Sequence, residues 1–182
     1  MSLSFRALIT AAIMGILSLG EPSLADAQDE TTAPPHVETS LPFKEVGSGT
    51  YRRFGFSVYQ ATLWAVGDGW NPHKPFLLEL HYVRDVSKDV LVESIIDDIR
   101  EQNAADDDEI GKWQHTLADI LPDVQEGDTL SGLSVPGAKT KIFRNGREIA
   151  TLDDELLSRA FFNMWFGDHA DPDLRKELLG TS

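Results

Sequence analysis

The order of strand-like and helix-like segments predicts an α+β fold in which helices cover one face of an antiparallel sheet. Strand patterns come first along the chain, followed by two helices, further strands, and one or two helices at the end. Elements grouped in blocks favour this arrangement over a parallel sheet, which needs alternating strands and helices. The strand patterns alternate between apolar and polar residues, as expected where one face is buried and the other is wetter.

The first residues are typical of an export signal rather than of a folded domain. Arg6 supplies a positive charge before the uncharged run at 7–19, which is short for a membrane span. The sequence Ala-Asp-Ala at 25–27 then matches the small-residue pattern that signal peptidase reads. We expect a signal peptide at 1–27, cleaved after Ala27, and a secreted or periplasmic protein without stable membrane insertion. An uncleaved membrane anchor is the alternative.

After the signal, the chain is expected to continue with a short disordered lead-in and one domain. Residues 28–40 are polar, contain two prolines and lack periodicity, which indicates disorder. Residues 41–182 form the predicted domain. Its first strand is predicted over 51–67, where aromatic and β-branched residues are frequent, and the next over 76–86, after a turn at 71–75.

The middle and the end of the chain contain helix and hairpin signals. Two helices are predicted over 87–104 and 109–121, and aspartates that precede the second helix are able to cap it. Asn145-Gly146 lies between two strand-like runs and predicts a two-residue hairpin turn. Two more helices follow, one that starts from a capping-box pattern at 151–154 and one that ends at Gly180.

The composition excludes several classes of function. The formal net charge of −14 disfavours nucleic acids as partners, since these need clustered Lys and Arg, and it also disfavours anionic lipid headgroups. The absence of cysteine excludes thiol nucleophiles and disulfides, so the core itself must hold the fold together. The histidines show no metal-binding spacing, and Gly-Ser-Gly at 47–49 lacks the phosphate-loop pattern and is interpreted as a turn. We therefore expect neither a metal ion nor a cofactor.

A predicted helix near the C-terminus carries an unusual concentration of aromatic residues. At about 3.6 residues per turn, Ser158, Phe161, Phe162 and Trp165 fall on one side of this helix. One interpretation is a buried core helix whose serine hydroxyl bonds to the carbonyl one turn earlier. The other is that the helix forms one wall of a cavity, since ligand pockets are mostly apolar with a few placed polar groups. The residues alone leave both interpretations open.

Five segments carry a resemblance to a known family by their order and spacing. They are GSGTYRRFGFSVYQATLW, LLELHYVRDVS, LPDVQEGDTL, FRNGREIATL and DDELLSRAFFNMWFGDHADPDLRKELLG, and the resemblance covers about residues 41–180. In this order they resemble the chalcone isomerase-like family, and more closely its exported bacterial branch. The resemblance implies an open-faced β-sandwich, in which a curved antiparallel sheet packs against a layer of helices and encloses a cleft. Plant enzymes of this fold close a flavanone ring, whereas a sister group binds fatty acids without catalysis.

The resemblance also implies candidate site residues. The plant enzymes combine an arginine, a threonine on an early strand, a tyrosine, an asparagine and a hydroxyl residue on the late helix. In this chain the late-helix hydroxyl corresponds to Ser158, the early-strand threonine to Ser57, and the arginine to Arg52 or Arg53. Because neighbours in a strand point to opposite faces, we expect only one of the two arginines to enter the cleft.

Two positions depart from the pattern of the enzymes. The tyrosine position falls near Val90 and the asparagine position near Asp97. Valine cannot order water or polarise a carbonyl, and a carboxylate would repel a phenolate nucleophile. Tyr59 or Tyr82 would have to supply the phenol from another place in the fold. These departures favour a binding protein over an enzyme.

The leading hypothesis is a non-catalytic binder of a small apolar acid, such as a fatty acid, held in the cleft between sheet and helices. The expected ligand-binding residues are Arg52, Arg53, Ser57, Tyr59, Ser158, Phe161, Phe162 and Trp165. The alternative is an isomerase (intramolecular lyase) of the chalcone isomerase type that acts on an unknown enone. Its candidate catalytic residues are Arg52, Arg53, Ser57 and Ser158. A third hypothesis is a protein-interaction module whose cleft is filled by side chains.

Overall fold

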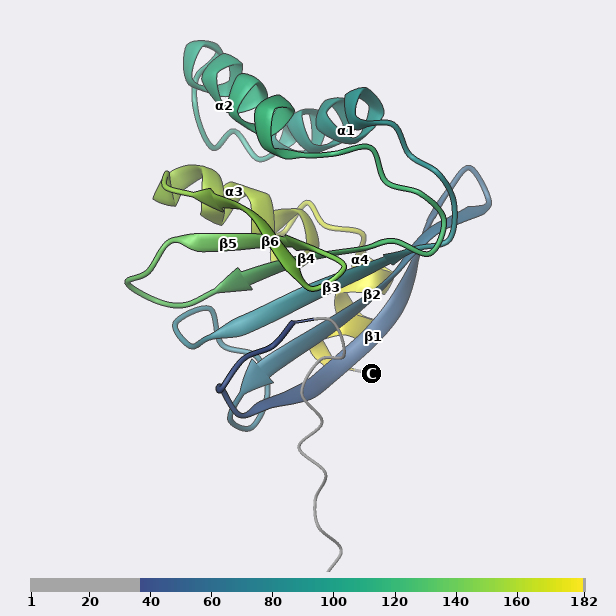
Figure 1. The fold of residues 1–182 in the computed structure, drawn as a ribbon, viewed down its shortest axis with the longest axis vertical. Coiled ribbons are helices and arrows are strands. Elements are labelled where there is room, and N and C mark those ends of the chain that lie inside the picture. Colours follow the sequence, from purple (N-terminus) through teal and green to yellow (C-terminus); the bar gives the residue numbers. More distant parts are fainter. Residues whose placement is uncertain (1–36, 182) are drawn as a thin grey trace, which may run out of the picture. The chain divides into compact units, whose positions relative to one another are not determined.

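The computed structural model describes residues 37–181. In this part of the chain, six strands form one antiparallel sheet in the order β1-β2-β3-β4-β5-β6. The strands are β1 (Phe43–Arg53), β2 (Phe56–Val66), β3 (Phe76–Tyr82), β4 (Thr129–Ser134), β5 (Thr140–Arg144) and β6 (Arg147–Leu152). The helices are α1 (Lys88–Glu101), α2 (Asp107–Ile120), α3 (Glu155–Phe166) and α4 (Pro172–Leu179) (Figure 1).

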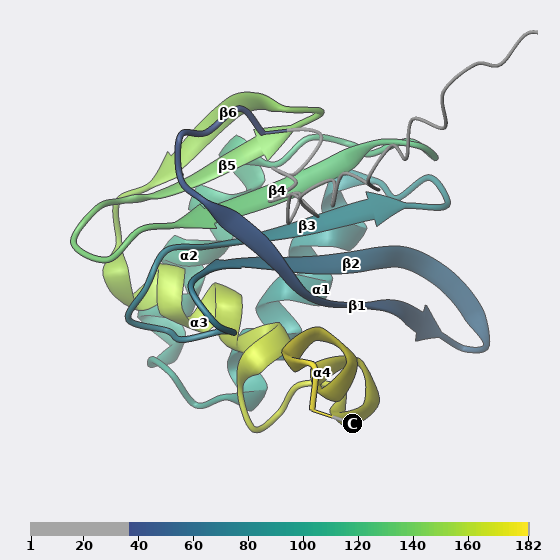
Figure 2. The ribbon, with the colours of Figure 1, turned by 90° about the horizontal axis from the view of Figure 1, so that it is seen from below.

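The helices cover one face of the sheet. Figure 2 shows the strands in their sequence order, with α1, α2 and α3 behind the sheet and α4 next to β1 at one edge. The main core fills the space between these layers, where Leu78 and Leu80 of β3 belong to the same buried cluster as Ile95 of α1 and Trp165 of α3. The predicted α+β class, an antiparallel sheet packed against a layer of helices, is confirmed.

The predictions for the N-terminus lie mostly outside the described residues. The signal peptide at 1–27 and residues 28–36 of the lead-in are not part of this description. Val37, near the end of the predicted lead-in, is only 2% exposed and belongs to a cluster with Phe43 and Trp64 on the second face of the sheet. Within residues 37–181, no helix has the length and apolar character needed to cross a bilayer.

The first strand pattern contains a hairpin that the sequence analysis missed. The prediction of one strand over 51–67 is wrong, because the chain reverses at Phe54-Gly55 and Arg53 pairs with Phe56. Both turn residues have positive φ, 51° and 81°. A two-residue turn of this kind usually carries Asn-Gly or Asp-Gly. Because Phe54 occupies the first turn position in place of Asn or Asp, the sequence of residues 51–67 has the pattern of one continuous strand.

A second correction concerns the glycines at 47–49. They lie inside β1 and not in a turn, at the place where α4 packs on this strand. A Cβ atom on Gly47 would overlap the backbone carbonyl of Glu177, and one on Gly49 would overlap the Glu177 side chain. The glycines therefore allow a helix to approach the strand backbone, which is a packing role that no turn pattern reveals.

The helix ends largely follow the predicted signals. Asp106 caps α2, and Asp154 caps α3 by accepting hydrogen bonds from two backbone N–H groups of the first turn, at 2.8 and 3.1 Å. Gly180 ends α4 with a left-handed φ of 62°. Thr151 takes no part in the cap of α3, because β6 extends through this residue. The capping-box prediction at 151–154 is thus wrong, because Asp154 is itself the N-cap residue of α3 and not the partner three positions inside the helix.

Candidate functional site

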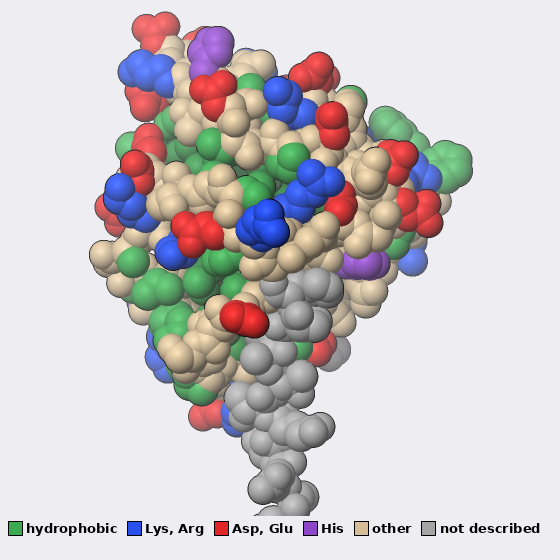
Figure 3. Space-filling view, in the orientation of Figure 1, with side chains coloured by type: hydrophobic (Ala, Val, Ile, Leu, Met, Phe, Trp, Pro, Cys, Tyr) green, Lys and Arg blue, Asp and Glu red, His purple; other side chains and the backbone are tan. Residues whose placement is uncertain are grey.

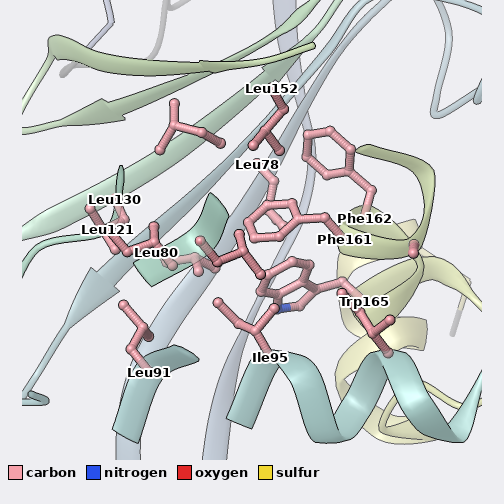
Figure 4. Close-up of a cluster of buried hydrophobic side chains, with 14 of the residues drawn as sticks. Leu78, Leu80, Leu91, Ile95, Leu121, Leu130, Leu152, Phe161, Phe162 and Trp165 are labelled. Carbon is pink, nitrogen blue, oxygen red and sulfur yellow. The ribbon is translucent and has the colours of Figure 1, made fainter. Parts of the chain in front are cut away.

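A cavity of about 620 Å³ lies between the helix-covered face of the sheet and helices α1 and α3. Its inner walls are apolar. Figure 4 shows side chains from the sheet and from both helices converging there. The apolar wall residues are Leu78, Leu80 and Leu130 of the sheet, Leu91 and Ile95 of α1, and Phe161, Phe162 and Trp165 of α3. The volume falls within the range of about 300–1,000 Å³ that is usual for small-molecule sites.

The mouth of the cavity is shaped by a β-bulge in the first hairpin. Tyr51 pairs with Tyr59, but the next residue, Arg52, pairs with Ser57, so Val58 is an extra residue in β2. One extra residue reverses the alternation of side chains beyond it. Tyr59 and Val58 both line the cavity in consequence, although neighbours in a regular strand face opposite ways.

Three tyrosines form the polar part of the sheet wall. Tyr51 and Tyr59 are stacked with ring centroids 5.0 Å apart, and the Tyr82 ring lies 5.5 Å from that of Tyr59. The Tyr59 hydroxyl accepts a hydrogen bond of 3.0 Å from Nε1 of Trp165. Burial raises the pKa of Tyr59 well above its ordinary value of 10.0, and the bond from Trp165 offsets this only in part. Burial also raises the pKa of Tyr51 and of Tyr82, so the cavity presents neutral phenols, which are able to donate hydrogen bonds.

Charged groups are confined to the mouth. Arg53 donates a hydrogen bond of 2.9 Å from Nη1 to the Ser94 hydroxyl of α1, which ties the hairpin to the helix. Asp98 lies one turn further along α1 and also lines the cavity. Burial raises the pKa of Asp98, Glu101 raises it further, and the Arg53 guanidinium opposes both. The site thus has a charged entrance and an apolar interior.

Comparison with known proteins decides the family. The sequence model of a family described as chalcone isomerase-like matches residues 38–180. The chain belongs to the chalcone isomerase-like family. Among solved structures, it is similar to a fatty-acid binding protein from Arabidopsis thaliana with a TM-score of 0.60 and 15% sequence identity. The match covers 80% of this chain and 90% of that protein, and at this identity it shows a shared fold. A search of curated protein sequences gives no match.

These comparisons confirm the resemblance to chalcone isomerase-like proteins and the fold that it implies. The structure then shows which predicted site residues this family member brings together. Six of them line the cavity: Arg52, Arg53, Tyr59, Phe161, Phe162 and Trp165. Both arginines do so, contrary to the expectation of one.

The two predicted serines lie outside the cavity lining. Ser57 comes just before the extra residue Val58 and pairs with Arg52, whereas Tyr59 beyond the bulge pairs with Tyr51, so the bulge breaks the alternation that would place Ser57 and Tyr59 on one face. Ser158 is on the same helical face as Phe162 and Trp165, but it belongs to the first turn of α3. Only the second half of this helix reaches the cavity, because the first turn is held beside α2 by the bond from Trp113 Nε1 to Asp154.

The structure also shows where Val90 and Asp97, the two positions that depart from the enzyme pattern, lie. Val90 lines the mouth and is 53% exposed, so no phenol occupies this place. Asp98 lines the cavity, as do Asp85, Glu101 and Asp171, whereas Asp97 forms an exposed ion pair of 3.3 Å with Arg100. A shift of one residue along a helix rotates the side chain by about 100°, which explains how counting from a strand missed it.

Several lining residues were missed by the sequence analysis, above all Tyr51, Arg84 and Ser94. Tyr51 stands next to the two arginines, and its aromatic character is the one signal that was available. Arg84 and Ser94 come from a loop and from a helix whose orientation to the hairpin depends on the folded structure. Within residues 37–181, no group of three His, Asp or Glu side chains is arranged to hold a metal ion.

Proposed function

We propose that this protein is an exported, non-catalytic binder of a small apolar acid, such as a fatty acid. The observation that carries the proposal is the cavity of about 620 Å³, which has an apolar interior and an arginine fixed at its mouth. The apolar tail would pack against Leu78, Phe161 and Trp165, while the acid head would remain at the charged entrance. The similar Arabidopsis protein is a fatty-acid binding protein, which supports the same ligand class.

Arg53 is the residue that we assign to the acid head. It pairs with Phe56, another cavity residue, and its guanidinium is already held over the entrance by Ser94. Arg52 also lines the cavity, but its strand partner Ser57 does not. A guanidinium forms short, charge-assisted hydrogen bonds with a carboxylate, and such bonds are about twice as strong as neutral ones. The neutral hydroxyl of Tyr51 is a further donor at the same end of the cavity.

Palmitic acid and hexadecanol provide a direct test, because they share the tail and differ in the head. We expect calorimetric titration of the full chain to show tighter binding of the acid. Arg53→Gln should weaken acid binding by about 10- to 100-fold, the effect of losing a hydrogen bond to a charged group, and should leave alcohol binding unchanged. Arg100→Gln, which alters an exposed arginine paired with Asp97 outside the cavity lining, is the matched control. Failure of the chain to take up either compound would refute the proposal.

A second candidate function is an isomerase of the chalcone isomerase type. The observation that favours it is the group of three tyrosines in the cavity, since a neutral phenol can polarise a substrate carbonyl. Incubation with chalcones and spectroscopic detection of ring closure separates the two candidates. Turnover that is lost in Tyr51→Phe and in Tyr59→Phe would replace the binding proposal. A cleft filled by side chains, the third hypothesis, is not supported by a cavity of this volume.

Export is the part of the proposal that rests on the N-terminal sequence. A positive charge, an apolar run and a small-residue site occur in the order that signal peptidase requires. Mass spectrometry of the protein recovered from expressing cells should find a chain that begins at Gln28 in the periplasm or medium. A chain that retains Met1 in the membrane fraction would favour the uncleaved anchor.

A further inference from the structure

The mouth of the cavity is surrounded by exposed apolar side chains. Six large apolar residues are exposed within residues 37–181, and four of them lie at this end of the sheet: Phe54 at 88%, Phe56 at 61%, Val90 at 53% and Val83 at 41%. Phe54, Phe56 and Val90 line the cavity itself, and the Val83 N–H bonds to the Val58 carbonyl beside them. Figure 3 shows hydrophobic side chains that protrude where Figure 1 places the tip of the β1–β2 hairpin.

The turn at this tip is unfavourable in two separate ways. A second hairpin of the same chain, β5–β6, has the same turn backbone, with φ of 49° at Asn145 and 77° at Gly146. Phe54 takes the place of that asparagine with φ of 51°, although a bulky residue is rarely found in this conformation. Its ring also remains exposed, so no packing within the described chain compensates for the turn strain. A contact with an apolar partner would account for both features.

Cations accompany the exposed rings. The Arg53 guanidinium lies 5.6 Å from the centre of the Phe54 ring, and the Arg84 guanidinium lies 5.2 Å from that of Phe56. The segment at 51–56 contains two arginines and no acidic residue, within a chain whose net charge is −14. Asp98 of α1 faces Arg53, and Asp85, Glu101 and Asp171 also line the cavity. At physiological salt, charges more than about 8 Å away are largely screened, so the tip interacts by its local charge.

We propose that the β1–β2 hairpin tip docks onto the surface of a phospholipid bilayer. Phe54 and Phe56 enter the boundary between headgroups and acyl chains, and Arg53 and Arg84 contact lipid phosphates, as in other amphipathic surface anchors. Docking in this way turns the mouth of the cavity toward the lipid, so an apolar ligand passes between bilayer and cavity without crossing water. The loading role rests on the proposed function, whereas docking does not depend on any ligand.

Phe54→Asn separates a role of Phe54 in membrane docking from a role in the stability of the fold. This variant installs the residue that the β5–β6 turn already uses, so we expect it to raise the midpoint of urea unfolding. We expect the same variant to lower the partition of the full chain onto phosphatidylcholine–phosphatidylglycerol vesicles by about tenfold, because an exposed ring is lost. Leu156→Asn removes a 49% exposed apolar side chain on α3 and should leave partition unchanged. Equal partition of the wild-type chain and Phe54→Asn would overturn the proposal.

A site-specific label excludes binding through the N-terminal segment. Because the chain has no cysteine, a polarity-sensitive fluorophore can be attached to Phe54→Cys, or to Ala138→Cys in the β4–β5 turn at the other end of the sheet. Vesicles free of fatty acid should shift the emission of the first label to shorter wavelength and leave the second unchanged. Sedimentation with vesicles without a shift at position 54 would overturn the proposal. Binding of the hairpin tip to a protein, without binding to vesicles, would also overturn the proposal.

Discussion

Asp128 fixes the corner of the fold that supports the tyrosine wall of the cavity. Its carboxylate accepts hydrogen bonds from the Gln125 N–H at 2.8 Å, from Arg144 Nη2 at 2.6 Å and from Asn145 Nδ2 at 2.7 Å. Its carbonyl accepts a further bond of 2.8 Å from the Tyr82 N–H. Burial alone would raise the pKa of Asp128, but these donors and the Arg144 charge lower it from 3.8 to about 2.

This lowered pKa predicts how the stability of the protein depends on pH. One pKa unit corresponds to about 1.4 kcal/mol, so the shift accounts for about 2 kcal/mol of the free energy of unfolding after allowance for partial hydration. The pKa is lower in the folded state than in the unfolded state. The stabilisation is therefore complete above about pH 4 and is lost as pH falls toward about 2.

Urea unfolding of Asp128→Asn and of the wild type tests this. At pH 7 we expect the variant to be less stable by about 2 kcal/mol, and we expect the difference to shrink as the pH falls below 4. The matched control is Asp153→Asn, since Asp153 pairs with Lys139 at the same 2.6 Å but with side chains that are 68% and 63% exposed. An exposed pair contributes about 0–1 kcal/mol. Equal losses in the two variants, or a difference that does not change with pH, would refute the reasoning.

Two further substitutions test the packing around the site. Gly47→Ala places a Cβ against the Glu177 carbonyl and should lower the free energy of unfolding by about 1–3 kcal/mol in urea titrations, whereas Gly111→Ala, with open space around it, should not. Trp165→Phe removes the 3.0 Å bond to the Tyr59 hydroxyl and should cost about 1 kcal/mol by the same measurement. No loss in either variant would contradict the packing described.

Much of the fold could be predicted because local signals and tertiary structure agree. Asn145-Gly146 forms the predicted hairpin, Asp106 caps α2, and Gly180 ends α4 in the left-handed conformation. Each of these signals acts within a few residues, so the sequence pattern contains all the necessary information. The hairpin at Phe54 was missed because phenylalanine rarely adopts a positive φ, so the local sequence does not indicate the turn that the fold imposes there.

The candidate site could be predicted only in part, because strand register decides it. The aromatic residues of α3 were found from helical periodicity, which the folded structure preserves. Ser57 was expected in the cleft from the family resemblance, which does not reveal that the extra residue Val58 separates Ser57 from the register of Tyr59. No local pattern marks this bulge. Asp98 and Ser94 enter the site through the packing of α1 on the hairpin, which is a long-range contact.

The aromatic helix α3 serves two purposes along its length. At its start, Asp154 caps the helix and also accepts a 2.8 Å bond from Trp113 of α2, which closes this end of the core. Ser158 lies in this part and is not among the residues that line the cavity described above. About two turns later, Trp165 bonds to Tyr59 and turns its ring toward open space. One helix can thus complete a core at one end and form the wall of a ligand site at the other.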